Sequence, residues 1–416
     1  MAAVRIRALE FFKADPDKFD LVFVANASAA IKLVGEALRD HIDSLNSDIE
    51  EGTTRGQTRL HYAYHKDAHN SLVGLRELTG NEATTVFRSD AEVEAWLGIS
   101  ESSTDASEHD LTLFAYPGQS NMTGRRLPLH WLKSAKQRPN TYTLLDAAAL
   151  ATTKQLDISS WTPDFTAISF YKIFGFPDLG ALIVRKSVAQ LLMGKKYFAG
   201  GTVDGVMVFG DAPRMIRRQS VHEVLEEGTL PFHNIIALDH AFDTHVRLFR
   251  SMDTVSAHVA ALTRYCVAQL CALKHASGQK LCEIYSLDSL LSNDPSQHGG
   301  TIAFNLYRPD GAKISYRAVE QAADAAGIYL RSGAMCNPGG MATHLGWEAE
   351  ELERLFEAGF RCSKPIEVYE GKWTGVVRVS FGAASAKGDV DLFIGFLRRI
   401  YLDRCWLDHG SKRVRV

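Results

Sequence analysis

Buried-strand patterns alternate with helical or loop stretches through the first half of the chain, and this alternation limits the folds open to it. The first strand pattern, residues 20–24, is followed by a polar turn at 26–28 and an amphipathic helical pattern over 29–38. Further strand patterns cover residues 111–115, 141–145, 166–170 and 181–184. Apolar strands separated in this way are typical of an α/β protein with a large, mostly parallel, helix-covered sheet.

The second half of the chain has a different character. A long helical pattern with few breakers covers residues 238–275. After it, strand patterns at 300–306, 328–330 and 376–381 are interleaved with helical patterns at 316–326, 348–360 and 389–402. We therefore predict a large domain of residues 1–240, followed by a linking helix and a smaller α+β domain within residues 241–416. The polar stretches 40–57 and 100–110 are expected to be solvated loops.

Composition excludes several classes of function. A net charge of −3 on 416 residues gives no bulk attraction to nucleic acid or to an anionic membrane. The longest apolar runs are far shorter than the roughly 20 residues that span a bilayer, and no secretory signal opens the chain. Six cysteines without CxxC spacing indicate a reduced, cytoplasmic compartment and no metal site.

One lysine stands between two apolar strand patterns in the stretch AISFYKIFGFPDLGALIVR, residues 167–185. Apolar walls on both sides of Lys172 would favour its neutral amine, which condenses with a carbonyl as a Schiff base. The candidate carbonyl is the aldehyde of pyridoxal 5′-phosphate. Asp146 ends another buried strand pattern, where its carboxylate could pair with a protonated pyridine nitrogen. A surface lysine is the alternative for Lys172 alone, but the pairing with Asp146 favours the cofactor.

Several separated motifs occur in an order that resembles a known family. The strongest are SFYKIFGFPDLGALIVRK, LLDAAAL and RSGAMCNPGG. Together they resemble the class V pyridoxal-phosphate enzymes, the group of cysteine desulfurases and their relatives. Within that group the chain is most similar to the amino-terminal desulfurase domain of the molybdenum cofactor sulfurases, and Tyr171 and Ala149 favour that branch. The resemblance covers essentially the whole chain and implies a fold-type I transferase.

The resemblance also implies roles for individual residues. Ser28 and the backbone of Ala27 would hold the cofactor phosphate, although Ser28 could instead be a simple helix N-cap. His69 would stack on the pyridine ring and exchange protons with the substrate. Asn121 would lie near the cofactor's phenolic oxygen and the substrate carboxylate, unless it is only a turn residue. Ser169 would be a further phosphate ligand.

Three other residues belong to the set of expected site residues: Gly228, Thr229 and Arg378. Gly228 and Thr229 match a pair that, in this family, reaches the phosphate of the partner subunit, which implies a homodimer with composite active sites. Arg378 lies in a strand of apolar and small residues, where a guanidinium needs an anion. The resemblance supplies the substrate carboxylate, and an internal salt bridge is the alternative.

Cys336 distinguishes a sulfur-transfer enzyme from a plain aminotransferase. It lies among turn-forming residues in RSGAMCNPGG, so we predict a mobile loop that is neither helix nor strand. A thiol exposed on such a loop near Arg331 could be partly ionised and act as a nucleophile. Burial as an inert cysteine is the alternative. The other five cysteines are expected to be structural.

The resemblance therefore implies a homodimeric L-cysteine desulfurase with Lys172, Cys336 and His69 as catalytic groups. It would form a persulfide and alanine and pass the sulfur to molybdenum cofactor or to a sulfur-acceptor protein. The alternatives are a pyridoxal-phosphate lyase or aminotransferase, a selenocysteine lyase, or a truncated non-catalytic binding protein. The last arises because an amino-terminal arm and the molybdenum-cofactor-binding domain of the family are missing from this sequence.

Overall fold

A computed structural model describes residues 1–47, 57–79, 83–98, 110–209, 214–217, 219–292, 294 and 296–402. The chain forms two compact units, each described here by itself. The first contains residues 1–121, 126–256 and 336–340, and the second contains residues 122–125, 257–335 and 341–416. Our predicted domain boundary after residue 240 falls within helix α11 (Phe232–Phe249).

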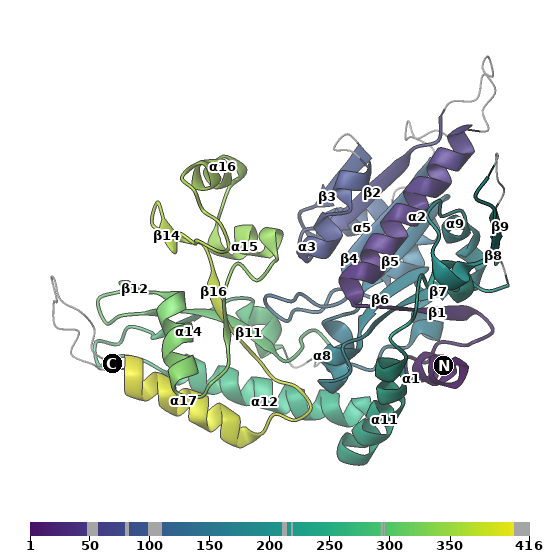
Figure 1. Cartoon of the computed structure of the whole chain (residues 1–416). Coiled ribbons are helices and arrows are strands. Elements are labelled where there is room, and N and C mark those ends of the chain that lie inside the picture. The colour runs from purple at the N-terminus through teal and green to yellow at the C-terminus, as the bar shows by residue number, and fades with distance from the viewer. Residues whose placement is uncertain are drawn as a thin grey trace. The chain divides into compact units, whose positions relative to one another are not determined.

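A seven-stranded sheet organises the first unit (Figure 1). Its strands, in sheet order, are β1 (Phe19–Val24), β7 (Gly180–Arg185), β6 (Phe165–Ser169), β5 (Thr141–Asp146), β4 (Leu111–Pro117), β2 (Leu60–His65) and β3 (Thr84–Phe87). The pairs from β6 to β3 are parallel, whereas β7 is antiparallel to both β6 and β1. The predicted α/β class with a mostly parallel sheet is confirmed. Strands β2 and β3 were not predicted.

Alternating side chains of this sheet enter two separate cores. On β7, Ala181 and Ile183 belong to one core, and Leu182 and Val184 belong to the other. Helices α1 (Ala2–Phe11) and α11 contribute to the first core, and α2 (Ala27–Ser47) contributes to the second. Burial on both faces explains why these strands are continuous apolar runs in the sequence.

Helix α2 is longer than its pattern predicted. The polar residues 40–47 belong to it and not to a loop; the rest of the expected loops lies mostly outside the described residues. Asp40 is buried on this helix, and its carboxylate accepts the Lys196 N–H. Because Lys196 is far from Asp40 in the sequence, the polar Asp40 was interpreted as a loop residue.

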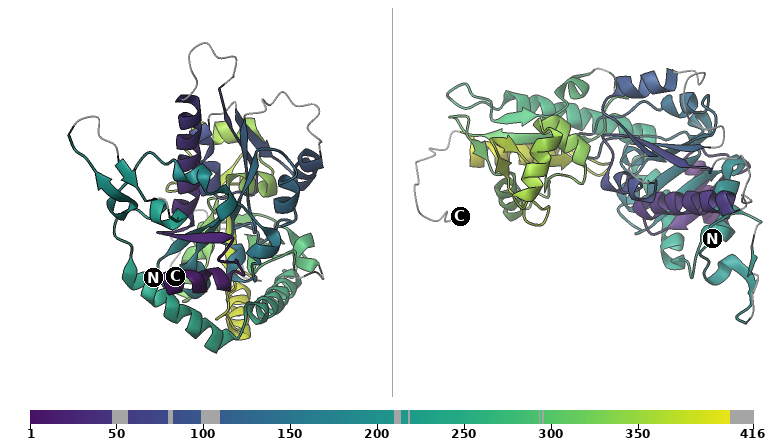
Figure 2. Two further views of the ribbon diagram at one scale, coloured as in Figure 1. Left: turned by 90° about the vertical axis from the view of Figure 1, so that its right-hand side faces the viewer. Right: turned by 90° about the horizontal axis from the view of Figure 1, so that it is seen from above.

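Shorter elements complete the first unit. They are α3 (Asn70–Val73), α4 (Arg76–Thr79), α5 (Asp90–Gly98), α6 (Trp131–Ala135), α7 (Ile158–Trp161), α8 (Phe170–Phe174), α9 (Gln190–Met193) and α10 (Val221–Leu225). The ribbon of β8 (Val203–Val206) and β9 (Arg214–Ile216) stands away from the sheet (Figure 2).

The second unit contains an antiparallel sheet in the order β10 (Cys282–Ile284), β11 (Thr301–Tyr307), β16 (Val376–Ser380) and β13 (Arg331–Gly333), with β12 (Lys313–Ile314) beside β11. Its core joins this sheet to α12 (Met252–Ala272), α14 (Tyr316–Ala325) and α17 (Lys387–Tyr401). The remaining elements are α13 (Leu287–Leu291), α15 (Pro338–Leu345), α16 (Ala349–Glu357), β14 (Val368–Tyr369) and β15 (Lys372–Trp373).

Two predictions in this half are wrong in detail. The long helical pattern at 238–275 is two helices, α11 and α12, because Arg250 adopts a φ of 66° that no α-helix continues. The apolar run 328–330 is not a strand; the strand β13 begins at Arg331, where pairing with β16 starts. In the part of the chain that the structure describes, every helix is too short or too polar to cross a bilayer.

Candidate functional site

The N-terminus of α2 forms a cradle for an anion. Asn26 caps this helix, since its Oδ1 accepts the Ala29 N–H at 3.0 Å. The Ala27 N–H donates to Ser169 Oγ at 3.2 Å, which joins the helix to the end of β6. Ser28 is exposed, and its Oγ lies 2.5 Å from Ser71 Oγ. Because Asn26 is the cap, Ser28 remains as a hydroxyl at a helix N-terminus, where phosphate binds readily.

Close packing fixes this cradle to the sheet. A Cβ at Gly180, the first residue of β7, would lie 2.6 Å from backbone atoms of Asn26 and 2.8 Å from the Ile168 carbonyl oxygen. Real Cβ atoms essentially never approach so closely, so only glycine fits at this position. The cradle is therefore held by backbone packing as well as by the Ala27–Ser169 hydrogen bond.

Asp146 lies at the carboxyl end of β5, opposite Ala167 on β6 and Pro117 on β4. It is 8% exposed, and its Oδ1 accepts the Ala148 N–H at 3.0 Å. Burial raises the pKa of Tyr62 well above its usual value, and the charges of Tyr64 and Asp146 add to this rise. A carboxylate held at the ends of parallel strands is suited to a cationic ring nitrogen.

Lys172 lies on the short helix α8, which follows β6 directly. Its side chain is exposed. The expectation of apolar walls on both sides is therefore wrong for this chain, because the strands that flank Lys172 in the sequence are in the sheet while the lysine lies beyond their ends. Its place three residues after Ser169 still puts the amine on the segment that leaves the cradle.

His69 precedes α3 and caps it, since its Nδ1 accepts the Ser71 N–H at 3.1 Å. An Nδ1 that accepts a hydrogen bond carries no proton, so in the neutral ring the proton is on Nε2. Ser71 Oγ lies 3.0 Å from the same nitrogen and also contacts Ser28. The half-buried His69 and the α2 cradle are thus joined through Ser71.

Cys336 lies in a turn between β13 and α15, and it is partly exposed. Its carbonyl oxygen accepts the Asn70 N–H at 2.9 Å, which ties the turn to the segment after His69. The next residue, Asn337, is fully buried; its amide donates to the Asp67 carbonyl oxygen at 3.0 Å and to Asn121 Oδ1 at 3.1 Å. The predicted mobile loop is therefore a turn fixed at several points. Within RSGAMCNPGG, β13 and the start of α15 also contradict the expected absence of helix and strand.

The other described cysteines differ from Cys336. Cys266 and Cys282 are buried, and burial raises the pKa of Cys266 to about 12 and also raises that of Cys282. These two thiols stay protonated at neutral pH, as structural cysteines do. Cys271 and Cys362 are exposed, so burial does not support a structural role for them. Cys405 lies outside the described residues.

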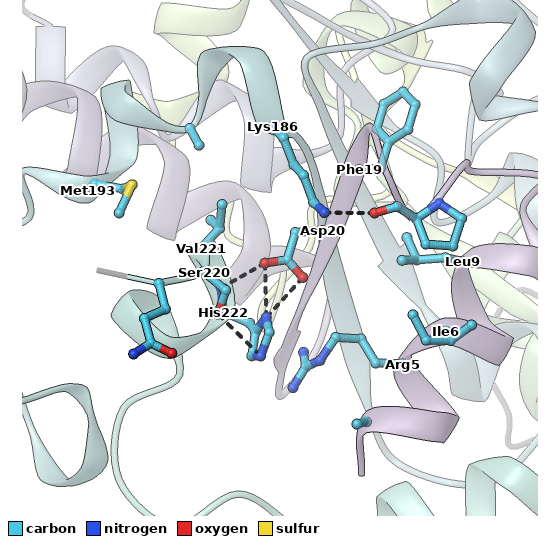
Figure 3. A pocket seen from close by; sticks show the side chains of 14 residues that line it. Arg5, Ile6, Leu9, Phe19, Asp20, Lys186, Met193, Ser220, Val221 and His222 are labelled. Atoms are coloured by element: carbon cyan, nitrogen blue, oxygen red, sulfur yellow. Dashed lines mark hydrogen bonds and ion pairs between the residues drawn. The ribbon is translucent and has the colours of Figure 1, made fainter. Parts of the chain in front are cut away.

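Gly228 and Thr229 are exposed after α10. Helix α10 is anchored to β1, because the buried Asp20 carboxylate lies 2.9 Å from His222 Nδ1 and accepts the His222 N–H at 3.1 Å. Asp20 and His222 line a pocket of about 400 Å³. Figure 3 shows their side chains pointing toward each other. That pocket is lined by other residues than the predicted site residues, so it is separate from the candidate site.

Arg378 belongs to the second unit and lies on β16 directly opposite Arg331 on β13. Its side chain is half-buried, and its neighbours along the strand, Val377 and Val379, are buried. Like charges directly opposite each other on neighbouring strands repel. This arrangement favours an anion near the two guanidinium groups.

The sequence interpretation missed three residues of this network: Asn26, Ser71 and Asn337. Asn26 carries a local signal, because asparagine is a favoured N-cap directly before a helix and α2 begins at Ala27. Asn337 makes its contacts with residues 67 and 121, and no pattern local to it predicts them.

The groups of the first unit fit the predicted cofactor by their chemistry. The α2 cradle offers the Ser28 and Ser169 hydroxyls at a helix N-terminus to a phosphate, Asp146 offers a carboxylate to a protonated ring nitrogen, and Lys172 offers an exposed amine to an aldehyde. Asp146 ends β5 and Lys172 follows β6; because these two strands are parallel neighbours, both residues lie at the same edge of the sheet.

Comparison with known proteins shows related sequences. Residues 1–393 match the family model described as aminotransferase class-V. A molybdenum cofactor sulfurase of Neosartorya fischeri is 48% identical over 408 residues, which are 96% of this chain and 46% of that protein. The molybdenum cofactor sulfurase of Aspergillus clavatus gives the same identity and coverage. The chain thus spans just under half the length of these curated relatives.

Solved structures share the fold. A cysteine desulfurase from Thermococcus onnurineus, in its apo form, superposes with a TM-score of 0.70 and 18% identity over 96% of this chain and 83% of that one. The cysteine desulfurase CsdA of Escherichia coli gives a TM-score of 0.67 and 18% identity over 96% and 82% of the two chains. The predicted fold-type I architecture is confirmed by these likenesses, and the family match extends over nearly all of the chain. This chain belongs to the aminotransferase class-V family.

Proposed function

We propose that this chain is a pyridoxal-phosphate-dependent L-cysteine desulfurase that forms a persulfide on Cys336. The observation that carries the proposal is the hydrogen bond from the Asn70 N–H to the Cys336 carbonyl oxygen. It joins the segment of the expected nucleophile to the segment of the expected cofactor-stacking residue, His69. The names of the relatives, which are sulfurases, and of the solved structures, which are desulfurases, support a sulfur-transfer reaction.

Several groups would hold the cofactor. Ser28 and Ser169 bind the phosphate at the α2 N-terminus, beside Ala27, whose N–H donates to Ser169 Oγ. Asp146 holds the proton on the ring nitrogen, and Lys172 binds the aldehyde through its amine. When bound, pyridoxal phosphate withdraws electrons from the substrate carbon skeleton.

The remaining groups act on the substrate. Arg378 binds the cysteine carboxylate in a two-pronged hydrogen-bonded pair, and Asn121 orients the same end of the molecule. Lys172 takes the proton from the substrate Cα. The Cys336 thiolate attacks the substrate sulfur; an S–S bond forms and the C–S bond breaks. The electron pair of the broken bond stays with the carbon skeleton, whose Cβ takes up a proton. Lys172 returns its proton to Cα, and the product leaves as alanine.

The destination of the sulfur and the assembly are part of the same proposal. The acceptor is molybdenum cofactor, as the names of the curated relatives suggest. Gly228 and Thr229, exposed after α10, contact the cofactor phosphate of a partner subunit in a homodimer. We place the protein in the cytoplasm, where the thiol of Cys336 stays reduced.

The test is incubation of the purified protein with L-cysteine and pyridoxal phosphate, with alanine and protein-bound persulfide measured in the same samples. A desulfurase forms alanine and persulfide in step until the protein thiol is filled. A lyase would instead release pyruvate and sulfide with no protein-bound sulfur, and an aminotransferase would form a keto acid. A binding protein would produce none of these.

A further inference from the structure

The Asn337 side chain caps a helix and also makes hydrogen bonds that capping does not require. It precedes Pro338, the first residue of α15, and its Oδ1 accepts the Gly340 N–H at 2.8 Å. Asn337 is therefore the N-cap of α15, and Pro338 occupies the first helical position, where proline is favoured. The side-chain amide group takes no part in capping, yet it donates to the Asp67 carbonyl oxygen and to Asn121 Oδ1.

The backbone around Asn337 is held just as closely. Met335 and Cys336 adopt φ values of 58° and 53°, in the left-handed region that residues with a Cβ avoid. A Cβ at Gly339 would lie 2.2 Å from the Lys66 carbonyl oxygen, so the 337–340 backbone rests directly on the backbone of Lys66. A strained turn persists only where its surroundings fix it, and such turns occur at functional sites.

We propose that Asn337 is a positioning residue, which fixes the Cys336 turn to the segment that carries His69. This inference rests on the proposed function and goes further into it. The two amide hydrogen bonds attach the turn at Asp67, two residues before His69, and at Asn121. The Asn70 hydrogen bond attaches it on the other side of His69. The turn that carries the Cys336 thiol is thereby held in one conformation before the substrate binds. This preorganisation lowers the entropic cost of the attack on the substrate sulfur.

The interaction with Asn121 adds a second consequence. Asn121 Oδ1 accepts from the Asn337 amide, and this hydrogen bond fixes the orientation of the Asn121 side chain. Asn337 thus sets the orientation of Asn121 as well as the place of the thiol. The positions of the Cys336 thiol and of the Asn121 amide therefore both depend on the buried Asn337 side chain.

Asn337→Ser tests this proposal, because serine keeps an N-cap oxygen for α15 but lacks the amide donors and is too short to reach Asn121. The matched control is Asp157→Ala. Asp157 caps α7 in the same unit through Ser160 N–H at 2.8 Å, so its loss removes a cap far from the Cys336 turn in the sequence. Two quantities are measured: the iodoacetamide labelling rate of Cys336 without L-cysteine, and kcat and KM for L-cysteine.

We expect Asn337→Ser to label several-fold faster, since the released turn exposes its thiol. Its kcat should fall by about 10²-fold, the cost of a nucleophile displaced by roughly 1 Å, while KM changes little. The Asp157→Ala protein should match the wild type in its labelling rate and in its kcat and KM. Wild-type labelling and wild-type kcat in Asn337→Ser, or the same changes in both variants, would overturn the proposal.

One measurement needs no variant and no turnover. In the wild-type protein the Asn70 N–H should exchange with deuterium far more slowly than the N–H groups of an exposed turn, because it donates to Cys336. Exchange of Asn70 at the rate of an open loop would overturn the inference even if Asn337→Ser does not fold. The labelling and exchange results stand if the protein proves inactive toward cysteine, so failure of the proposed function and failure of this inference are distinguishable.

Discussion

At the scale of single residues, the structure assigns different states to residues that look alike in the sequence. Cys266 is a buried thiol whose pKa rises to about 12, whereas Cys336 lies partly exposed in a strained turn. Asn26 and Asn337 both cap helices, but only Asn337 also uses its amide group to join distant segments. Residue type therefore defines what chemistry is available, and the contacts decide which residue performs it.

Lys172 gives the first prediction at this scale. Lys172→Ala should lose the visible absorption of a lysine-bound pyridoxal phosphate, because no other amine follows Ser169 on the segment that leaves the cradle. Borohydride reduction of the wild-type protein, followed by peptide mapping, should attach the cofactor to the peptide that contains Lys172. Attachment to another lysine would refute the assignment.

Arg378 gives the second prediction. Arg378→Ala should raise the KM for L-cysteine by at least about tenfold, since a charge-assisted pair with the substrate carboxylate is lost. Cofactor absorption should be unchanged. Arg378→Lys serves as the control, and it should recover part of the affinity because it restores the charge without the planar fork. A KM equal to that of the wild type would show that the guanidinium binds something other than substrate.

At the scale of elements, the sequence predicted the buried strands better than it predicted where elements begin and where one helix gives way to the next. Strands β1, β5, β6 and β7 are confirmed because burial on both faces makes each a continuous apolar run. The break between α11 and α12 was missed, because Arg250 is a good helix former whose positive φ comes from its surroundings. The strand at Arg331 was misplaced by three residues, since only pairing with β16 defines where it begins.

The same limit applies to the candidate site. Motifs located the cradle, Asp146, Lys172 and Cys336 in the sequence, and the structure places all four in the first unit. The fixed Cys336 turn was not predictable, because its restraints come from residues 67, 70 and 121, far away in the sequence. Its glycines and proline indicated mobility when taken alone.

Helix α10 gives a prediction at the scale of elements. Burial of Asp20 raises the pKa of its carboxyl group. The hydrogen bond and charge of the His222 side chain, together with the backbone N–H groups of His222 and Leu21, outweigh burial, and the pKa is lowered from 3.8. A carboxyl group with a lowered pKa in the folded state adds stability that is present above pH 3.8 and lost as the pH falls through the folded-state pKa.

Asp20→Asn should therefore reduce the free energy of unfolding by about 1.5–3 kcal/mol at pH 6–7, the value of hydrogen bonds to a charged group. Urea unfolding at a series of pH values measures the difference from the wild type. The difference should stay constant down to about pH 5 and shrink below about pH 4. A difference that grows toward low pH would contradict this account of the Asp20–His222 pair.

At the scale of the whole molecule, the proposal builds each active site from residues of two subunits. Gly228 and Thr229 are exposed in the single chain, and the proposal gives them a phosphate on a partner subunit. The curated relatives are about twice as long as this chain, so transfer of sulfur to molybdenum cofactor is a property to be tested on the chain as it stands.

Mixed dimers test the composite site. We expect Lys172→Ala and a Gly228→Val/Thr229→Ala double variant to be inactive alone, the first without its amine and the second without its phosphate contact. Co-expression with two affinity tags yields heterodimers in which one of the two sites has every group intact. These heterodimers should recover desulfurase activity, whereas heterodimers as inactive as both parents would mean that each chain builds its site alone.

The most direct test of the account is the mass of the Cys336 peptide after treatment with L-cysteine. In the wild-type protein this peptide should gain one sulfur atom, about 32 Da, while alanine accumulates. Cys336→Ser should still bind pyridoxal phosphate, but it should gain no sulfur, and its alanine production should fall steeply. A wild-type protein that turns over cysteine without ever carrying sulfur on Cys336, or a Cys336→Ser protein that forms alanine at the wild-type rate, would contradict the proposed desulfurase.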